Sequence, residues 1–240
     1  MSEPIVTVRG LHFQYTDGTV ALAGVDFVLR AGETVALLGP NGSGKTTFVL
    51  HLNGLLEGKG EIMVCGMPVA KRTFAAVRQK IGIVFQDSDD QLFMPTVLED
   101  VAFGPLNLGL SRDEAVSRAR RVLEQVGMVD ALHKAPYHLS AGQKKRVAIA
   151  GVLAMEPEIL VLDEPTTFLD PPGQEALTHL LRGLPQTKLL VTHDTDFAQA
   201  LATRAIFFQK GRIAGEGAVP DVLERFGWGT HVPKLSRGAR

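Results

Sequence analysis

One stretch decides the fold of this 240-residue chain: Gly39-Pro40-Asn41-Gly42-Ser43-Gly44-Lys45-Thr46. It matches the pattern G-x-x-x-x-G-K-[ST], whose glycines let backbone N–H groups converge on phosphate oxygens. It follows an apolar run typical of a buried strand, residues 34–38, and precedes a helical pattern that begins near Gly44. We therefore predict a phosphate-binding loop in which Lys45 reaches the β- and γ-phosphates of a nucleotide and Thr46 ligates Mg²⁺. The alternative is a glycine-rich turn without a ligand.

The surrounding pattern predicts an α/β architecture. Residues 5–15 and 22–29 alternate apolar and polar positions around the turn pair Asp17-Gly18, which indicates an antiparallel hairpin. Strand 34–38 is followed by further short apolar runs, separated by helical pattern or loop, at residues 81–85, 159–162, 188–192 and 205–208. Such runs favour a mostly parallel sheet that is covered on both faces.

Between residues 87 and 156 the pattern becomes helical. Ser111 and Glu114 form a capping-box pair ahead of apolar residues at helical spacing, from Ala115 to Val126. We expect a single domain, 1–240, with a core formed by 1–86 and 157–226. Residues 87–156 form its helical subdomain, and 227–240 form a short tail that frays.

Composition excludes several classes of protein. The chain has 25 Lys+Arg and 26 Asp+Glu, so its net charge of −1 gives no electrostatic reason to expect nucleic-acid binding. The longest runs without a charged residue have 11 residues, for example at 34–44 and 46–56, short of the roughly 20 that span a bilayer. Cys65 is the only cysteine, and the segment MSEPIVTVRG at residues 1–10 is not an apolar export signal. We expect a cytoplasmic protein.

A pair of acids follows one of the predicted strands. Asp163 and Glu164 come directly after the run 159–162, which places them at the carboxyl edge of the sheet, where α/β ligand sites lie. Asp163 is suited to hold Mg²⁺ through water, and Glu164 to polarise an attacking water. The alternative is a helix cap or a solvated sheet edge.

The stretch Leu139-Ser140-Ala141-Gly142-Gln143 resembles the LSGGQ signature of ABC ATPases. Other motifs of that family are matched, in family order and over residues 5–215, by Tyr15, the phosphate-binding loop, Gln86, Asp163-Glu164, Phe168-Leu169-Asp170 and His193. The resemblance implies an ABC-type nucleotide-binding fold with an N-terminal antiparallel β subdomain and an inserted helical subdomain. It also implies an Mg-dependent ATP hydrolase that works as a head-to-tail dimer with two ATPs at its interface.

The same resemblance assigns roles to individual residues. Catalytic roles fall to Lys45, Gln86, Glu164 and His193, and metal binding to Thr46, Gln86 and Asp163. ATP binding falls to Tyr15, Gly39, Pro40, Asn41, Gly42, Ser43, Gly44, Lys45, Thr46, Thr47, Ser140, Gly142 and Gln143. Three of these residues have an alternative: Tyr15 is an ordinary strand aromatic beside Phe13, His193 is a helix-capping or surface histidine, and Ser140 with Gln143 is a capping box, which is compatible with anion binding.

Two longer stretches narrow the resemblance. Residues 86–109 and 143–155 look like ATPase subunits of energy-coupling-factor importers, most of all those for cobalt or nickel. Leu92, Phe93 and Met94 form an apolar triplet beside two acids, suited to docking a basic helix of a transmembrane subunit; the alternative is that they pack inside the helical subdomain. The implied partners are a second ATPase subunit, a transmembrane coupling subunit and a substrate-binding membrane subunit. We expect the two ATPase subunits to form a homodimer, and the alternative is a heterodimer with a distinct cassette. The implied location is peripheral, on the cytoplasmic face of the membrane.

Some features depart from the family pattern, and rival functions remain. Ala141 replaces a signature glycine, Phe168 stands where a small residue is common, and many relatives have a longer C-terminal segment that helps them dimerise. The rivals are an importer ATPase for a vitamin, an exporter subunit, a regulatory module without catalysis, and a soluble ABC ATPase acting on DNA or ribosomes. The soluble class inserts coiled coils or fuses two cassettes, whereas here only 93 residues without heptads separate Thr46 from Ser140.

Overall fold

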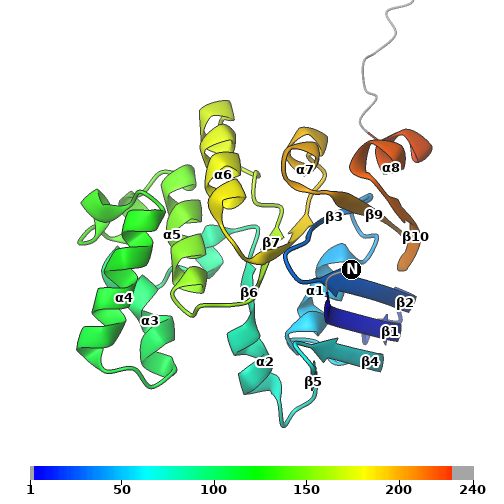
Figure 1. Cartoon of the computed structure of the whole chain (residues 1–240), viewed down its shortest axis with the longest axis horizontal. Coiled ribbons are helices and arrows are strands. Elements are labelled where there is room, and N and C mark those ends of the chain that lie inside the picture. The colour runs from blue at the N-terminus through cyan, green and yellow to red at the C-terminus, as the bar shows by residue number, and fades with distance from the viewer. Residues whose placement is uncertain (1–2, 229–240) are drawn as a thin grey trace, which may run out of the picture.

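The fold contains two β-sheets (Figure 1). A computed structural model describes residues 3–228 of the chain. The central sheet has the order β10-β9-β3-β8-β7-β6, and all of its neighbours pair in parallel except β10 and β9. Its strands are β3 (Thr34–Leu38), β6 (Ile81–Val84), β7 (Ile159–Asp163), β8 (Thr187–Val191), β9 (Arg204–Gln209) and β10 (Arg212–Gly217). The predicted, mostly parallel sheet is confirmed.

The second sheet is antiparallel and has the order β2-β1-β4-β5. It contains β1 (Pro4–Gln14), β2 (Val20–Arg30), β4 (Lys59–Val64) and β5 (Met67–Pro68). The predicted hairpin is confirmed as β1 and β2, and its turn is held by the side chain of Asp17, which accepts a hydrogen bond from the Thr19 backbone N–H. Gly18 adopts a φ of 90° in this turn, a conformation that favours glycine.

Alternate residues of the central strands supply separate hydrophobic clusters. In β3, Val35 and Leu37 pack with the antiparallel sheet and α1 (Lys45–Leu52), whereas Ala36 and Leu38 pack with α7 (Thr195–Leu201) and α8 (Val219–Arg225). Figure 1 shows α1 on one side of the sheet and α6 (Pro171–Gly183), α7 and α8 on the other. The sheet is covered on both faces, as predicted, but one cover includes a second sheet.

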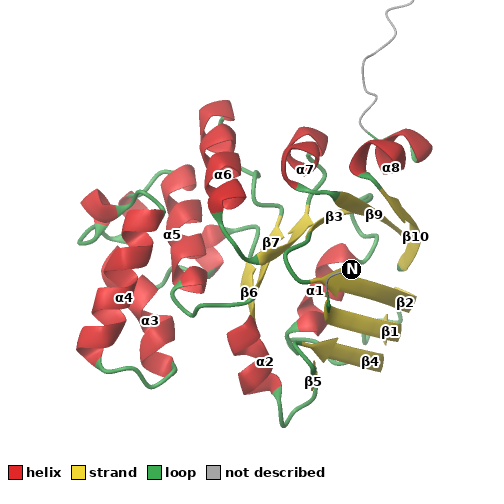
Figure 2. Cartoon of the chain, in the orientation of Figure 1, coloured by secondary structure: helices red, strands yellow, loops and turns green. Residues whose placement is uncertain are grey.

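Three helices stand to one side of the central sheet (Figure 2). They are α3 (Val97–Asn107), α4 (Arg112–Gln125) and α5 (Ala141–Leu153). Short 3-10 turns at Ser88–Asp90, Val129–Ala131 and Pro136–His138 complete this region, and α2 (Phe74–Lys80) lies before β6. Both sides of the predicted capping box between Ser111 and Glu114 are present at the start of α4. The predicted fold class, with its antiparallel and helical parts, is confirmed.

The structure differs from the sequence predictions mostly at element ends. Strand β6 stops at Val84, one residue early, and β8 begins and ends one residue early. The short strands β4 and β10 carry no apolar alternation and were not predicted. Of the predicted tail, residues 229–240 lie outside the described residues. Within residues 3–228, no helix is long and apolar enough to cross a bilayer.

Candidate nucleotide site

The loop between β3 and α1 has a backbone that requires glycine at two positions. Gly39 has a φ of 135°, and a Cβ there would lie 2.2 Å from the backbone oxygen of Phe208. Gly44, at the start of α1, has a φ of 105°, and a Cβ would lie 2.4 Å from the backbone oxygen of Ala21. These close approaches fix the loop against β9 and β2, so its backbone N–H groups are held in place before a ligand arrives.

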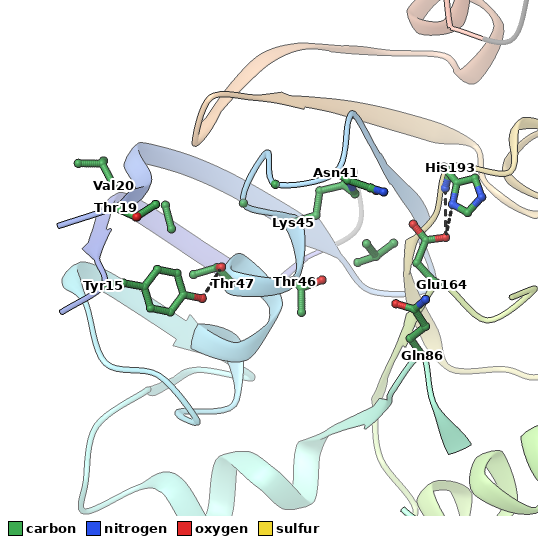
Figure 3. Close-up of a pocket in the computed structure, with 14 residues that line it drawn as sticks. Tyr15, Thr19, Val20, Asn41, Lys45, Thr46, Thr47, Gln86, Glu164 and His193 are labelled. Carbon is green, nitrogen blue, oxygen red and sulfur yellow. Dashed lines mark hydrogen bonds and ion pairs between the residues drawn. The ribbon is translucent and has the colours of Figure 1, made fainter. Parts of the chain in front are cut away.

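A pocket of about 470 Å³ opens beside this loop (Figure 3). It is lined by Tyr15, Thr19, Val20, Ala21, Asn41, Gly42, Gly44, Lys45, Thr46, Thr47, Gln86, Glu164, Val191 and His193. These side chains come from the hairpin, the loop and α1, and from the ends of β6, β7 and β8. Most of the residues predicted for the site therefore converge on one cavity. Gly39, Pro40, Ser43 and Asp163, which were also predicted, are not among its lining residues.

Lys45 is folded back onto the loop that it follows. Its ammonium donates hydrogen bonds to the backbone oxygens of Gly39, at 2.7 Å, and Pro40, at 3.1 Å. Burial lowers the pKa of Lys45, while the nearby Glu164 and Asp163 carboxylates oppose this shift. The ammonium is thus a positive charge at the edge of the pocket that is hydrogen-bonded to neutral backbone oxygens. An anionic phosphate is a stronger acceptor than these oxygens and would displace them.

The Thr46 hydroxyl and the Asp163 carboxylate lie side by side. The Thr46 hydroxyl donates to Oδ2 of Asp163 at 2.9 Å, and the other carboxylate oxygen, Oδ1, is buried with no hydrogen-bond partner among the described residues. Burial raises the pKa of Asp163, against the hydrogen bond from Thr46. An unpartnered, buried carboxylate oxygen beside a hydroxyl fits a hard divalent cation such as Mg²⁺.

Glu164 and His193 meet at the ends of β7 and β8. Glu164 has a left-handed backbone with a φ of 44°, and its N–H donates to the backbone oxygen of Val191. Its Oε2 accepts the backbone N–H of His193 at 3.3 Å and lies 2.7 Å from Nδ1 of the same ring. This arrangement holds the Glu164 carboxylate at the inner wall of the pocket, whereas the His193 ring is largely exposed (Figure 3).

Tyr15 lies at the opposite end of the pocket. Its hydroxyl shares a hydrogen bond of 2.9 Å with the Thr47 hydroxyl, and its ring packs edge-on against Phe13, with centroids 4.9 Å apart. The residue is 40% exposed. Tyr15 is therefore fixed both to the hairpin and to α1, with part of its ring open to a ligand, so stacking on adenine stays a prediction.

The remaining predicted residues line a different pocket. Ser140, Gly142 and Gln143 border a cavity of about 440 Å³ together with the loop around Phe168, which has a φ of 66° and is 72% exposed. The predicted capping box is present, because Ser140 and Gln143 each accept the other's backbone N–H. The structure thus does not bring these residues to the first pocket of the same chain.

Sequence reasoning missed one functional candidate beside the site. The ammonium of Lys145 donates to the backbone oxygens of Phe85, at 3.1 Å, and Gln86, at 2.7 Å. Burial lowers its pKa to about 8, against the attraction of Asp87 and Asp163. The only signal in the sequence is a lysine pair inside a helix whose other residues are largely apolar, and this pattern does not reveal which lysine is buried.

Comparison with known proteins identifies the family. A family model described as ABC transporter matches residues 22–167. The chain belongs to the ABC transporter family. Among its relatives is a putative ABC transporter ATP-binding protein of Streptomyces avermitilis, 55% identical over 93% of this chain and 86% of the relative. The energy-coupling factor transporter ATP-binding protein EcfA of Methanocaldococcus jannaschii is 49% identical, over 91% of this chain and 81% of EcfA.

Solved structures agree with this placement in the ABC family. One is cbiO1 from Clostridium perfringens, described as part of the ABC transporter complex cbiONQ. It has a TM-score of 0.84 and 39% identity over 94% of this chain and 92% of its own. Another is an ATP-binding cassette, MJ0796, solved as a dimer bound to ADP and Pi, with a TM-score of 0.80 and 30% identity over 89% and 98% of the two chains. The chain is an ABC transporter ATPase that binds and hydrolyses ATP, as predicted.

Proposed function

We propose that this chain is the ATP-hydrolysing motor subunit of an energy-coupling-factor importer, and that the imported solute is cobalt or nickel. The observation that carries the motor role is the convergence of Lys45, Gln86, Glu164 and His193 on one pocket. Similarity to EcfA and cbiO1 supports the importer type. The choice of cobalt or nickel rests on residues 86–109 and 143–155, and a vitamin is the alternative solute.

The pocket accounts for binding of the ATP phosphates and their metal. Backbone N–H groups of the loop and the Lys45 ammonium hold the β- and γ-phosphates, and the ring of Tyr15 stacks on adenine. Thr46, Asp163 and Gln86 would hold Mg²⁺, since the buried Oδ1 of Asp163 lacks a partner among residues 3–228. When bound, Mg²⁺ neutralises the charge that develops on the phosphate oxygens.

Glu164 and His193 account for the attack of water. The Glu164 carboxylate directly follows β7 and lines the same pocket as Lys45. It accepts a proton from the attacking water as the bond from the water oxygen to the γ-phosphorus forms and the bond from that phosphorus to the β–γ bridging oxygen breaks, which releases ADP and phosphate. His193 holds that carboxylate through its backbone N–H and its ring nitrogen. Its largely exposed ring is free to reach toward the γ-phosphate as well.

The position of the signature pocket supports a dimer. Ser140, Gly142 and Gln143 lie at the N-terminus of α5, where the helix dipole favours an anion, but they line a pocket of their own. In a head-to-tail homodimer this pocket faces the γ-phosphate of the ATP that the other copy holds. Two copies then close on two MgATP and reopen after hydrolysis, at the cytoplasmic face of the membrane.

One surface is suited to the transmembrane coupling subunit. Phe93 is 63% exposed, and its ring packs edge-on against Phe103, with centroids 5.0 Å apart; Leu106 on α3 is also exposed. Leu92 instead packs against the helical core, so only part of the predicted apolar triplet faces outward. Asp100 accepts the backbone N–H groups of Phe93 and Met94, which fixes the shape of this surface before a partner helix docks.

The motor role is tested by two substitutions. Glu164→Gln removes the base but keeps the shape of the side chain, so we expect ATP binding to persist and turnover to fall by about 100-fold or more. Lys45→Ala removes the phosphate-binding ammonium, so we expect nucleotide affinity to be lost. Equilibrium binding of ATP and release of phosphate measure both effects. Sustained turnover in Glu164→Gln, or unchanged ATP affinity in Lys45→Ala, would contradict the assigned roles.

The importer assignment is tested by isolating the complex. The tagged subunit is expressed at its native level, the membranes are solubilised gently, and the co-purifying proteins are identified. We expect one multi-spanning coupling subunit, one cobalt- or nickel-type membrane partner and no second ATPase. Several vitamin-binding partners or a second cassette would overturn the metal or the homodimer assignment while keeping the motor. Recovery of no membrane protein would overturn the importer.

A further inference from the structure

A buried lysine joins the nucleotide pocket to the signature helix. Lys145, in the second turn of α5, is 2% exposed, and its ammonium donates to the backbone oxygens of Phe85 and Gln86 at 3.1 and 2.7 Å. Gln86 lines the nucleotide pocket, whereas Ser140, at the start of the same helix, lines the signature pocket. One side chain therefore connects residues from both pockets.

Packing alone does not explain this ammonium. A buried charge loses its hydration, and an apolar side chain of similar length would fill the space without that cost. The ammonium reaches past the apolar face of α5 to two consecutive carbonyl groups at the point where β6 has ended and the strand hydrogen bonds have stopped. The Lys145 ammonium is thus placed to bind these two carbonyl oxygens, and its hydrogen bonds hold the backbone at Gln86 in position.

The segment that follows Gln86 is held firmly as well. The side chain of Gln91 accepts the backbone N–H of Phe85 at 2.9 Å and donates to the backbone oxygen of Ile83 at 3.0 Å. Lys144 forms an ion pair of 2.6 Å with Asp89, which is largely exposed. The backbone around Gln86 is therefore held by Gln91 and by Lys145 from α5, and Gln86 itself lines the nucleotide pocket.

We propose that Lys145 is a positioning residue, which fixes the Gln86 backbone to α5 so that the Gln86 amide is aimed at the nucleotide and any displacement of Gln86 moves the signature helix with it. This inference rests on the role proposed above for Gln86 as a ligand of MgATP. Lys145 is not among the residues that line the nucleotide pocket, although it borders the signature pocket beside Ser140. It acts through Gln86 at one end and through the first turn of α5 at the other.

The test compares full-length variants in a double-mutant cycle. Lys145→Met keeps the length of the side chain but removes its donors, and Gln86→Ala removes the amide that Lys145 is proposed to aim. We expect each substitution to lower kcat by about 10-fold or more, because a misplaced group near the reacting atoms loses rate steeply. We expect the double variant to lose no more than Gln86→Ala alone, since the two side chains act as one unit.

A binding measurement distinguishes a misplaced Gln86 amide from a general distortion of the nucleotide pocket. In a Glu164→Gln background, ATP affinity is measured with Mg²⁺ and with EDTA. We expect Lys145→Met to lower the Mg²⁺-dependent gain in affinity to the value seen for Gln86→Ala, while affinity in EDTA changes less than about 3-fold. Lys145→Gln, which keeps an amide donor, should give an intermediate gain, and it serves as the second variant if the methionine variant does not fold.

The neighbouring lysine is the matched control. Lys144→Met breaks an ion pair between the same two segments, at the surface, and should leave kcat and the Mg²⁺-dependent gain unchanged. A loss of kcat in Lys144→Met equal to the loss in Lys145→Met would overturn the positioning role of Lys145. Additive losses of kcat for Lys145→Met and Gln86→Ala in the double-mutant cycle would also overturn it. Normal kcat in Lys145→Met together with low kcat in Gln86→Ala would overturn this inference alone. Normal kcat in Gln86→Ala would instead contradict the proposed function.

Discussion

At the scale of single residues, much of the site follows from motifs, but its contacts do not. The glycines, Lys45 and Thr46 could be identified from their spacing, because the phosphate-binding loop is local in sequence. The bond from Lys45 back to Gly39 and the contact of Lys145 with Gln86 could not. They depend on where buried side chains find acceptors after folding, and in the case of Lys145 the partner lies 59 residues away.

The unpartnered oxygen of Asp163 predicts a specific effect of metal. In Asp163→Asn the amide cannot replace the anionic oxygen, so we expect ATP binding in EDTA to persist while the stimulation of binding and turnover by Mg²⁺ falls by at least about 10-fold. A titration with Mg²⁺ at fixed ATP measures the effect. Asp113→Asn, on the exposed side of α4, serves as the control. A normal Mg²⁺ response in Asp163→Asn would remove this residue from the metal site.

His51 predicts a loss of stability in acid. It is fully buried in α1, its Nδ1 faces the Thr47 backbone oxygen at 2.7 Å, Phe13 packs on its ring, and its Nε2 has no partner among the described residues. Burial lowers its pKa from 6.5 despite the hydrogen bond to Thr47. The unfolded chain therefore binds the proton first, so the stability that neutral His51 contributes is present above about pH 6.5 and is lost as pH falls below it.

Thermal unfolding at pH 7.5 and pH 5.5 measures this contribution. We expect the fall in Tm between the two pH values to be smaller in His51→Phe, which packs on Phe13 but cannot titrate. His133→Phe changes an exposed histidine and should retain the pH dependence of the native chain. The same fall in Tm in His51→Phe and in the native chain would show that other groups carry the acid sensitivity.

At the scale of elements, hydrophobic periodicity predicted the buried strands of the central sheet and helix α4. It failed for β4 and β10, whose sequences KGEIMV and RIAGEG carry glycines and charges among few apolar residues. These strands exist because they pair with β1 and β9, so their stability comes from the backbone ladder of a neighbour rather than from their own side chains. Such tertiary support leaves no local signal in the sequence.

The capping box at the start of helix α4 is a local signal that correctly predicted a helix, and its contribution to stability can be tested. Ser111→Ala removes the capping hydroxyl that accepts the Glu114 backbone N–H, so we expect the free energy of unfolding to fall by about 1 kcal/mol. Urea unfolding measures it. Ser117→Ala, at an exposed position within the same helix, should be neutral or slightly stabilising. ATP affinity should stay unchanged in both variants, and no difference in stability between them would contradict the cap.

At the scale of the whole molecule, the two regions proposed to bind ATP line different pockets of one chain, and this predicts assembly that depends on nucleotide. We expect Glu164→Gln to sediment as a dimer with MgATP and as a monomer without it, because each ATP then joins the loop of one copy to Ser140 of the other. The variant that combines Lys45→Ala with Glu164→Gln should stay monomeric. Dimers of equal stability with and without ATP would contradict this mode of assembly.

The left-handed backbone at Glu164 and Phe168 lowers the stability of the folded chain. Each such conformation costs a residue with a side chain about 1–3 kcal/mol, a cost that glycine would avoid and asparagine would reduce. A laboratory selection for heat tolerance alone would therefore favour glycine at position 164, and its most stable survivors would have lost the carboxylate that we propose accepts the proton of the attacking water. Improvement of this motor by directed evolution accordingly requires a selection that scores hydrolysis in every round.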